Sequence, residues 1–406
     1  MYRKKIFVIA VVMALATSLS STAVAKAATT ASDDACKSAV AGYDKNFYVE
    51  SCDKNFHLDV KGRVQVRAAA EKHDSDNGND GTDAQSFMIR RARLDFSGYA
   101  LTPKFTYDLQ LDLGGIPTAT DNNILYYAYA NYKATDAVQV LAGLHKLFFN
   151  RGEVTSDGKL EFVDRSIASE RYKLDRSIGA DVHGIFEDKK IEYHLAAFNG
   201  RNTRNALNKN QEFGYLTHLS FSPLGNYGYD EGDLKDSEAV QFTVGAGAAL
   251  WHEETANQNR VISSTADYGF KYRGWSSQGE AFFRNTDAVG GVQNDAGYSV
   301  QVGYFFIPKK LEFALRQAAL LDDLNDRGLN LNMTNGSLTG LSGVNAGVDQ
   351  NGDSANEYEY TGALSYYIKG HDIKIQAQYS LLMDGLTTSS SSLQNHIGML
   401  QGQFSF

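Results

Sequence analysis

The fold is decided by residues 56–68, which read FHLDVKGRVQVRA. Apolar side chains and one glycine occupy every second position, and charged or amide side chains occupy the positions between them. This alternation is the pattern of a β-strand that has one apolar face and one polar face. It continues for about a dozen residues, which is the length that a tilted strand needs to cross a membrane.

The same alternation recurs along the rest of the chain. About sixteen segments show it, beginning near residues 56, 86, 104, 122, 137, 177, 190, 212, 240, 265, 275, 297, 310, 357, 371 and 393. A helical period is absent from these segments, and only a weak one is found around residues 162–174. Because hydrocarbon offers no partner to an unpaired backbone group, strands can cross it only if they close into a barrel. We therefore predict an all-β fold, a transmembrane antiparallel up-and-down β-barrel of about 16 strands around a water-filled lumen.

The links between these strands alternate in length. Short links lie near residues 100–102, 134–135, 187–189, 273–274, 308–309 and 370, and longer polar links lie between them. Such barrels have short periplasmic turns and long outer loops, which sets the orientation. Residues 222–238 are an exception, because they should form a periplasmic turn and yet are long and acidic. Aromatic residues near the strand ends are expected on the lipid-facing side, as interfacial girdles: Tyr126, Tyr132, Tyr298, Tyr304, Phe306, Tyr358 and Tyr366.

The N-terminus has the pattern of a secretory signal peptide. Basic residues at positions 3–5 precede an apolar run, and small residues follow with two A-x-A cleavage patterns. A membrane anchor is the alternative, but the apolar run is too short to cross about 30 Å of hydrocarbon as a helix. A lipoprotein would need a lipobox before its cysteine, and the residues before Cys36, Asp33-Asp34-Ala35, do not resemble one. We predict a signal peptide (1–27), a short N-terminal periplasmic segment (28–55) and the transmembrane barrel (56–406).

The two cysteines and the charge balance limit the remaining classes. In an oxidising compartment Cys36 and Cys52 could form a structural disulfide, and two free thiols are the alternative. The chain has 48 acidic against 39 basic residues, which argues against nucleic-acid binding. We find no serine-nucleophile elbow, no phosphate-binding glycine loop and no zinc signature, so we expect neither an enzyme nor a cofactor. The nine histidines show no metal-ligand spacing, and the acidic residues of the link 321–356 could hold calcium or simply be solvated.

Several motifs together resemble a known family. IRRARLDFSG (89–98), YDLQLD (107–112) and GLHK (143–146) are similar, in order and spacing, to the second, third and loop-leading strands of the phosphate-selective porin O/P family. The resemblance implies a trimeric porin of the Gram-negative outer membrane, whose third loop folds inward and narrows the pore. It also implies passive diffusion of small anions, including phosphate or polyphosphate. The aromatic C-terminus at Phe406 resembles the signal read by the barrel assembly machinery.

An anion pore needs fixed cations on the polar faces of its strands, because a narrow channel focuses the field of a few charges. The first two strands and the third loop supply the candidates: Lys61, Arg63, Arg67, Arg91, Arg93, Lys146, Arg151, Arg165, Arg171 and Arg176. Arg90 falls on the apolar face, where it should snorkel or contact a neighbouring subunit. The loop carries nearly as many carboxylates as cations, so its arginines could either face solute or pair with those carboxylates. A general porin, a porin for another solute and a plugged structural or adhesive barrel are the alternative functions.

Overall fold

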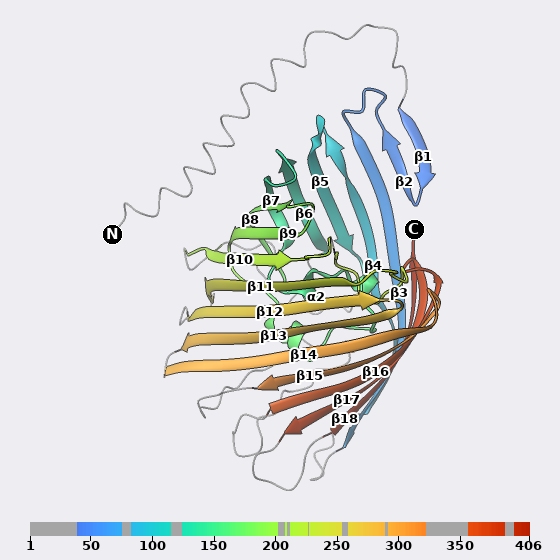
Figure 1. Cartoon of the computed structure of the whole chain (residues 1–406), viewed down its shortest axis with the longest axis vertical. Coiled ribbons are helices and arrows are strands. Elements are labelled where there is room, and N and C mark those ends of the chain that lie inside the picture. Colours follow the sequence, from blue (N-terminus) through green and yellow to red (C-terminus); the bar gives the residue numbers. More distant parts are fainter. Residues whose placement is uncertain are drawn as a thin grey trace.

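Sixteen antiparallel strands form a closed barrel (Figure 1). The computed structural model describes residues 39–74, 83–114, 124–201, 208, 212–225, 227–253, 259–288, 291–321, 356–385 and 394–406. The barrel strands are β3 (His57–Asp74), β4 (Ala84–Ala100), β5 (Thr102–Asp112), β6 (Leu125–Lys133), β7 (Gln139–Lys146), β8 (Arg176–Phe186), β9 (Ile191–Phe198), β10 (Gly214–Phe221), β11 (Gln241–His252), β12 (Arg260–Tyr272), β13 (Trp275–Ala288), β14 (Gly291–Ile307), β15 (Leu311–Leu321), β16 (Asn356–Lys369), β17 (Ile373–Gly385) and β18 (Gln394–Ser405).

Each strand pairs with the next one along the chain, and the last strand closes the ring. β18 pairs with β3 from Gln394↔Asp74 to Ser405↔Arg63. Closure leaves no strand edge in the ring without a partner, as a membrane requires. The predicted barrel is confirmed, and the largest differences are at β12 and β14, which begin at Arg260 and Gly291 rather than near 265 and 297.

The two faces of the sheet differ as the alternation predicts. On β3, the exposed Val64 and Val66 alternate with Gln65 and Arg67, whose side chains are completely buried inside the barrel. Large apolar side chains are exposed on the outer face all around the ring. Such a surface is stable only against lipid, because monomeric soluble proteins rarely expose large apolar patches.

Two β-bulges overturn two sequence-based expectations. Arg90 has no partner on β3, since Gln65 pairs with Arg91 and Val66 pairs with Ile89. The extra residue shifts the alternation by one position, so that Arg90 turns inward and its Nη2 lies 3.9 Å from the inner carboxylate of Asp164. The expectation that Arg90 snorkels into lipid or meets another subunit is therefore wrong.

The second bulge is in β6. Tyr127 pairs with Gln110 and Leu125 pairs with Leu111, which leaves Tyr126 without a partner on β5. Tyr126 is buried inside the barrel under the Arg93 guanidinium, 3.7 Å from its ring centre. It was expected in an outer aromatic girdle, and this expectation is wrong. Phe306 and Tyr366, in contrast, are exposed as predicted.

A hairpin precedes the barrel. β1 (Val40–Asp44) pairs with β2 (Asn46–Glu50), and β2 pairs with the first residues of β3. The sequence pattern did not predict these five-residue strands. Cys52, just after β2, is disulfide-bonded. Cys36, the other cysteine of the sequence, lies outside the described residues, as do the predicted signal peptide and the acidic residues of the link 321–356.

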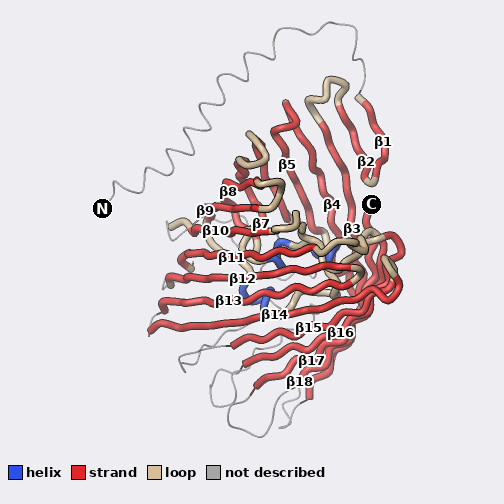
Figure 2. Tube along the Cα trace, in the orientation of Figure 1, coloured by secondary structure: helices blue, strands red, loops and turns tan. Residues whose placement is uncertain are grey.

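The described helices are short and all lie between β7 and β8. They are α2 (Arg151–Val154), a 3-10 turn η1 (Asp157–Lys159) and α3 (Ile167–Tyr172), and Figure 2 draws them in blue among the red strands. None of the described helices is long and apolar enough to cross a membrane. The weak helical period around residues 162–174 corresponds to α3, where the Ser166 hydroxyl accepts a hydrogen bond from the Ser169 N–H as an N-cap.

Candidate functional site

Residues 147–175, called here loop 147–175, connect β7 to β8 and contact the inner face of distant strands. The Val163 N–H donates to Gln378 on β17 at 2.8 Å, and the Gly152 N–H donates to Glu280 on β13 at 2.6 Å. Lys374 on β17 donates to the Leu160 carbonyl at 2.7 Å. Backbone groups that have no partner within the loop thus find polar side chains of the strands.

An apolar cluster anchors the same loop. Its side chains are completely or almost completely buried against apolar residues of the strands, among them Phe198, Trp251 and Phe282. The loop contributes Leu147, Phe149, Val163, Ile167, Ala168, Tyr172 and Leu174. Each large apolar side chain buried in this way stabilises the loop by about 1.5–3 kcal/mol. The cluster and the polar contacts together hold the loop in one arrangement.

Asp157 organises one group of cations. Its Oδ2 lies 2.5 Å from Arg93 Nη1 and 3.4 Å from Arg91 Nε, and Oδ1 accepts from Arg165. The hydroxyl of Tyr126 donates to Oδ2 at 3.2 Å. Burial alone would raise the pKa of Asp157, but the guanidinium groups of Arg165, Arg91 and Arg93 outweigh burial and hold it well below its ordinary value. Asp157 is therefore a fixed anion that holds three arginines.

Asp164 organises a second group. Its Oδ2 lies 2.6 Å from Arg67 Nη1, and its Oδ1 lies 3.4 Å from Arg91 Nη2 and 3.9 Å from Arg90 Nη2. Burial opposes ionisation here too, yet the arginines keep the pKa of Asp164 below its ordinary value. Arg91 links the two groups, so the wall formed by β3 and β4 is joined to the loop by a continuous set of charge-assisted hydrogen bonds.

The cations of β7, β8 and the loop are also paired. Lys146 donates to the Glu153 carbonyl at 2.5 Å, and Arg151 Nε donates to Asp267 at 2.7 Å. Arg176 pairs with its neighbour Asp175 and lies 3.4 Å from the ring centre of Tyr126. Arg171 is buried on α3. The predicted site residues therefore converge on one region, and most of them hold the loop in place.

Lys61 and Arg63 differ from the other cations. Lys61 is 39 % exposed, donates to the Ser97 hydroxyl at 2.7 Å and lies 3.7 Å from Asp95 Oδ1. Arg63 is half-buried against the η1 turn, where an added Cβ on Gly158 would lie 2.6 Å from its Cζ. No ion pair of Arg63 is formed among the described residues, and its Nε has no hydrogen-bond partner there. It lies directly opposite Arg93 in the register of β3 and β4.

The long acidic segment that includes residues 222–238 connects β10 to β11, called here link 222–240, and it contacts loop 147–175. Glu231 donates its N–H to the Lys159 carbonyl at 3.1 Å, and its carboxylate accepts from the Glu161 N–H at 2.8 Å. Gln278 of β13 donates to the same carboxylate at 2.7 Å. Burial raises the pKa of Glu161, and the Glu231 carboxylate raises it further. The length and acidity of this link thus reflect contacts with loop 147–175.

Three further lysines belong to the same interior, and two of them, Lys271 and Lys374, were not among the residues predicted from the sequence. Lys159 of η1 is exposed, whereas Lys271 of β12 and Lys374 of β17 are buried. All three, with Arg63, act electrostatically on His371 in the turn between β16 and β17. Burial lowers the pKa of His371, and these four cations lower it further. Lys271 and Lys374 fall on the polar faces of their strands, so the alternation could have identified them.

Comparisons with known proteins agree with this architecture. The family model described as phosphate-selective porin O and P matches residues 59–406. The fold is similar to the anion-selective porin from Comamonas acidovorans, with a TM-score of 0.58, 10 % identity and coverage of 86 % of this chain and 99 % of that chain. It is also similar to the outer membrane channel DcaP of Acinetobacter baumannii, with a TM-score of 0.56, 13 % identity and coverage of 90 % and 100 %. A search of curated proteins found no match.

Proposed function

Because this chain belongs to the phosphate-selective porin O and P family, we propose that its lumen passes small anions, phosphate among them, by passive diffusion. The family and the fold make it a porin of the Gram-negative outer membrane and indicate a channel rather than an enzyme. We further propose that loop 147–175 is the inward-folded third loop and that it narrows the passage. Its contacts with β13 and β17 support this proposal.

One observation carries the proposed anion preference. Arg63 and Arg93 lie directly opposite each other on neighbouring strands, and Arg91 lies two residues away on the same face. Like charges in this arrangement repel and destabilise a sheet. Asp157 pairs with Arg91 and Arg93, whereas Arg63 forms no ion pair among the described residues. A permeating anion would relieve the repulsion, and a planar guanidinium suits phosphate through two parallel hydrogen bonds.

The predicted site residues take two roles in this proposal. Lys61 and Arg63 face the permeating anion, while the other eight set the shape and charge of the constriction: Arg67, Arg91, Arg93, Lys146, Arg151, Arg165, Arg171 and Arg176. The buried carboxylates Glu161 and Glu231 oppose a pure anion preference. The same crowded interior favours a second candidate, a barrel whose pore is plugged by the loop and the link 222–240.

The proposal extends to assembly and processing. Residues 1–27 would be removed as a signal peptide, residues 28–55 would stay in the periplasm, and residues 56–406 would form the barrel. Phe406 would be read by the barrel assembly machinery before its backbone pairs with Gly62, to which its N–H donates at 3.0 Å. We propose a homotrimer with neither catalytic activity nor a cofactor. One similar structure, OmpT of Vibrio cholerae, is described as a trimer form (TM-score 0.51, 8 % identity, coverage of 86 % of this chain and 99 % of that chain).

Single-channel recording in planar lipid bilayers tests the function. The purified protein is expected to give stable conductance steps in potassium chloride. Added inorganic phosphate should reduce the chloride current in a saturable way, because phosphate competes with chloride for Arg63 and the neighbouring arginines of β3 and β4. Bilayers without steps would favour the plugged barrel, and a phosphate effect no larger than that of an equal addition of chloride would contradict a phosphate site.

A further inference from the structure

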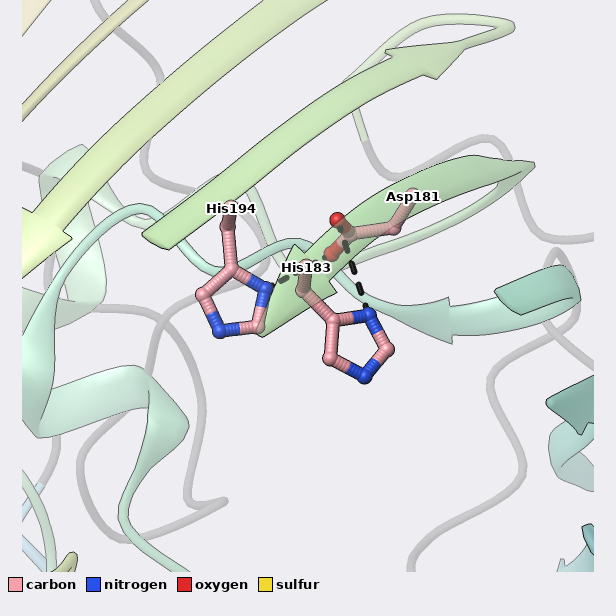
Figure 3. A group of neighbouring side chains, drawn as sticks. All are labelled: Asp181, His183 and His194. Atoms are coloured by element: carbon pink, nitrogen blue, oxygen red, sulfur yellow. Dashed lines mark hydrogen bonds and ion pairs between the residues drawn. The ribbon is translucent and has the colours of Figure 1, made fainter. Parts of the chain in front are cut away.

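We infer that the inner wall of the barrel carries a binding site for a divalent transition-metal ion of the zinc class, formed by Asp181, His183 and His194 (Figure 3). Asp181 and His183 lie on β8, and His194 lies directly opposite His183 on β9. Their two imidazole rings are stacked, with centres 5.1 Å apart and planes within 13° of each other. The ligands meet across two strands, so their spacing along the sequence shows no metal motif.

The distances suit a metal ion. Asp181 Oδ2 lies 2.8 Å from His194 Nδ1, and Asp181 Oδ1 lies 3.9 Å from His183 Nδ1. Ligand atoms around a tetrahedral zinc ion, with bonds of about 2.0–2.1 Å, stand roughly 3.3 Å apart. The two observed separations lie on either side of this value, and the ligand atoms of the three residues lie within 4.8 Å of one another. The two imidazole rings are nearly parallel, so at least one of them must turn before both nitrogens can bind one ion.

Two of these ligand atoms have no other partner. Asp181 Oδ1 and His183 Nδ1 are buried, and neither forms a hydrogen bond with the described residues. Buried polar atoms of this kind are rare, because each one costs the free energy of its lost hydration. A metal ion between the two atoms would satisfy both at once.

A carboxylate orients His194 for metal binding. Its Nε2 lies 3.3 Å from Glu192, whose other oxygen accepts from the Tyr229 hydroxyl at 3.0 Å. In the tautomer whose Nε2 proton Glu192 accepts, the lone pair of Nδ1 is free to bind an ion beside the Asp181 carboxylate. Without an ion, a proton on Nδ1 bridges the same 2.8 Å contact with Asp181 Oδ2, and the metal ion would take the place of that proton. The same carboxylate–histidine–metal arrangement fixes the ring in many zinc sites.

The donor set selects the class of ion. Two imidazoles and one carboxylate suit zinc, copper or nickel, whereas calcium and magnesium prefer oxygen ligands alone. Three protein ligands leave a fourth position for water or an anion. Phe148, at the start of loop 147–175, stacks on His194 with ring centres 3.8 Å apart. A bound ion would therefore add positive charge to the wall at the base of this loop.

Calorimetric titration of the chelator-treated protein in detergent with zinc chloride tests the site. One zinc ion is expected per chain, and His183→Asn and Glu192→Gln should each weaken binding by about tenfold or more. Glu192→Gln removes no ligand atom, so it keeps the test valid if a histidine variant folds poorly. The matched control is His396→Asn on β18, where the ring contacts the exposed Tyr379 hydroxyl, and its zinc affinity should equal that of the wild type.

Cobalt gives an independent readout of geometry. The cobalt-loaded wild type should show the intense visible bands of a four-coordinate ion, and His194→Asn should lose them. The inference is overturned if the wild type binds no zinc, because Asp181 and His194 then form only a proton-bridged ion pair. It is equally overturned if the His183 and His194 variants bind zinc as tightly as the wild type. Neither measurement requires an open pore, so the outcome is separate from that of the proposed function.

Discussion

Arg63→Ala should weaken the anion preference of the channel without weakening the barrel. Arg63 forms no ion pair among the described residues, so its removal leaves no buried carboxylate uncompensated. The substitution also removes the repulsion from Arg93, which lies directly opposite. We therefore expect the stability of the barrel to change by no more than about 0.5 kcal/mol.

The size of the effect follows from Coulomb's law. A monovalent ion that passes about 5 Å from a guanidinium in water gains or loses about 0.8 kcal/mol. When the arginine is removed, anions lose this attraction and cations lose an equal repulsion. The free energy of an anion relative to a cation at this point of the pore therefore changes by about 1.7 kcal/mol. Screening at about 0.1 M salt reduces the difference to roughly 1 kcal/mol. The ratio of anion to cation permeability should then fall about fivefold.

Reversal potentials in a potassium chloride gradient measure this ratio. The matched control is Arg260→Ala, which removes an arginine that is half-exposed at the start of β12 and pairs with Asp287. We expect the control to retain the wild-type reversal potential. An unchanged reversal potential for Arg63→Ala would refute the reasoning, because Arg63 would then not face the permeating ion.

Three further predictions concern the loop and the closure of the barrel. Arg67→Met leaves a buried carboxylate with fewer partners and should cost about 3 kcal/mol, seen as a lower temperature for loss of the folded band on gels; an unchanged temperature would show that the pair is not needed. Gly62→Val should lower the folded yield in liposomes, because its Cβ would lie 2.3 Å from the ring of Phe406, and a wild-type yield would argue against this close contact. Glu161 has its pKa raised by burial and by Glu231, so the native state binds more protons than the unfolded state and stability should fall as pH rises above the ordinary glutamate value of about 4.3. Glu161→Gln should flatten that part of the stability profile, and an equally steep profile in the variant would assign the pH dependence to other groups.

The barrel could be predicted from the sequence because its physics is local. A strand with two different faces shows the alternation in its own residues alone. Because hydrocarbon offers no partner to unpaired backbone groups, such strands must close into a barrel. The hairpin of β1 and β2 escaped prediction because each strand has only five residues. Five residues are too few to separate an alternating pattern from chance.

The inward-facing cations of β3 and β4 could be predicted for the same reason, but their partners could not. Arg67 meets Asp164 across 97 positions of sequence, and no local pattern encodes this pairing. The two failures, Arg90 and Tyr126, are both at β-bulges, where one extra residue reverses the inside and outside of a strand. Both bulged residues contact carboxylates of loop 147–175. The alternation therefore failed at the positions where a bulge turns a side chain inward to contact this loop.

The sign of the reversal potential of the wild-type protein tests the central claim most directly. With purified protein in a planar bilayer and a potassium chloride gradient, we predict a potential displaced towards the equilibrium potential of chloride, because Lys61, Arg63 and the neighbouring arginines favour anions. A potential displaced towards that of potassium would contradict the account, since the carboxylates of the interior would then control the passage.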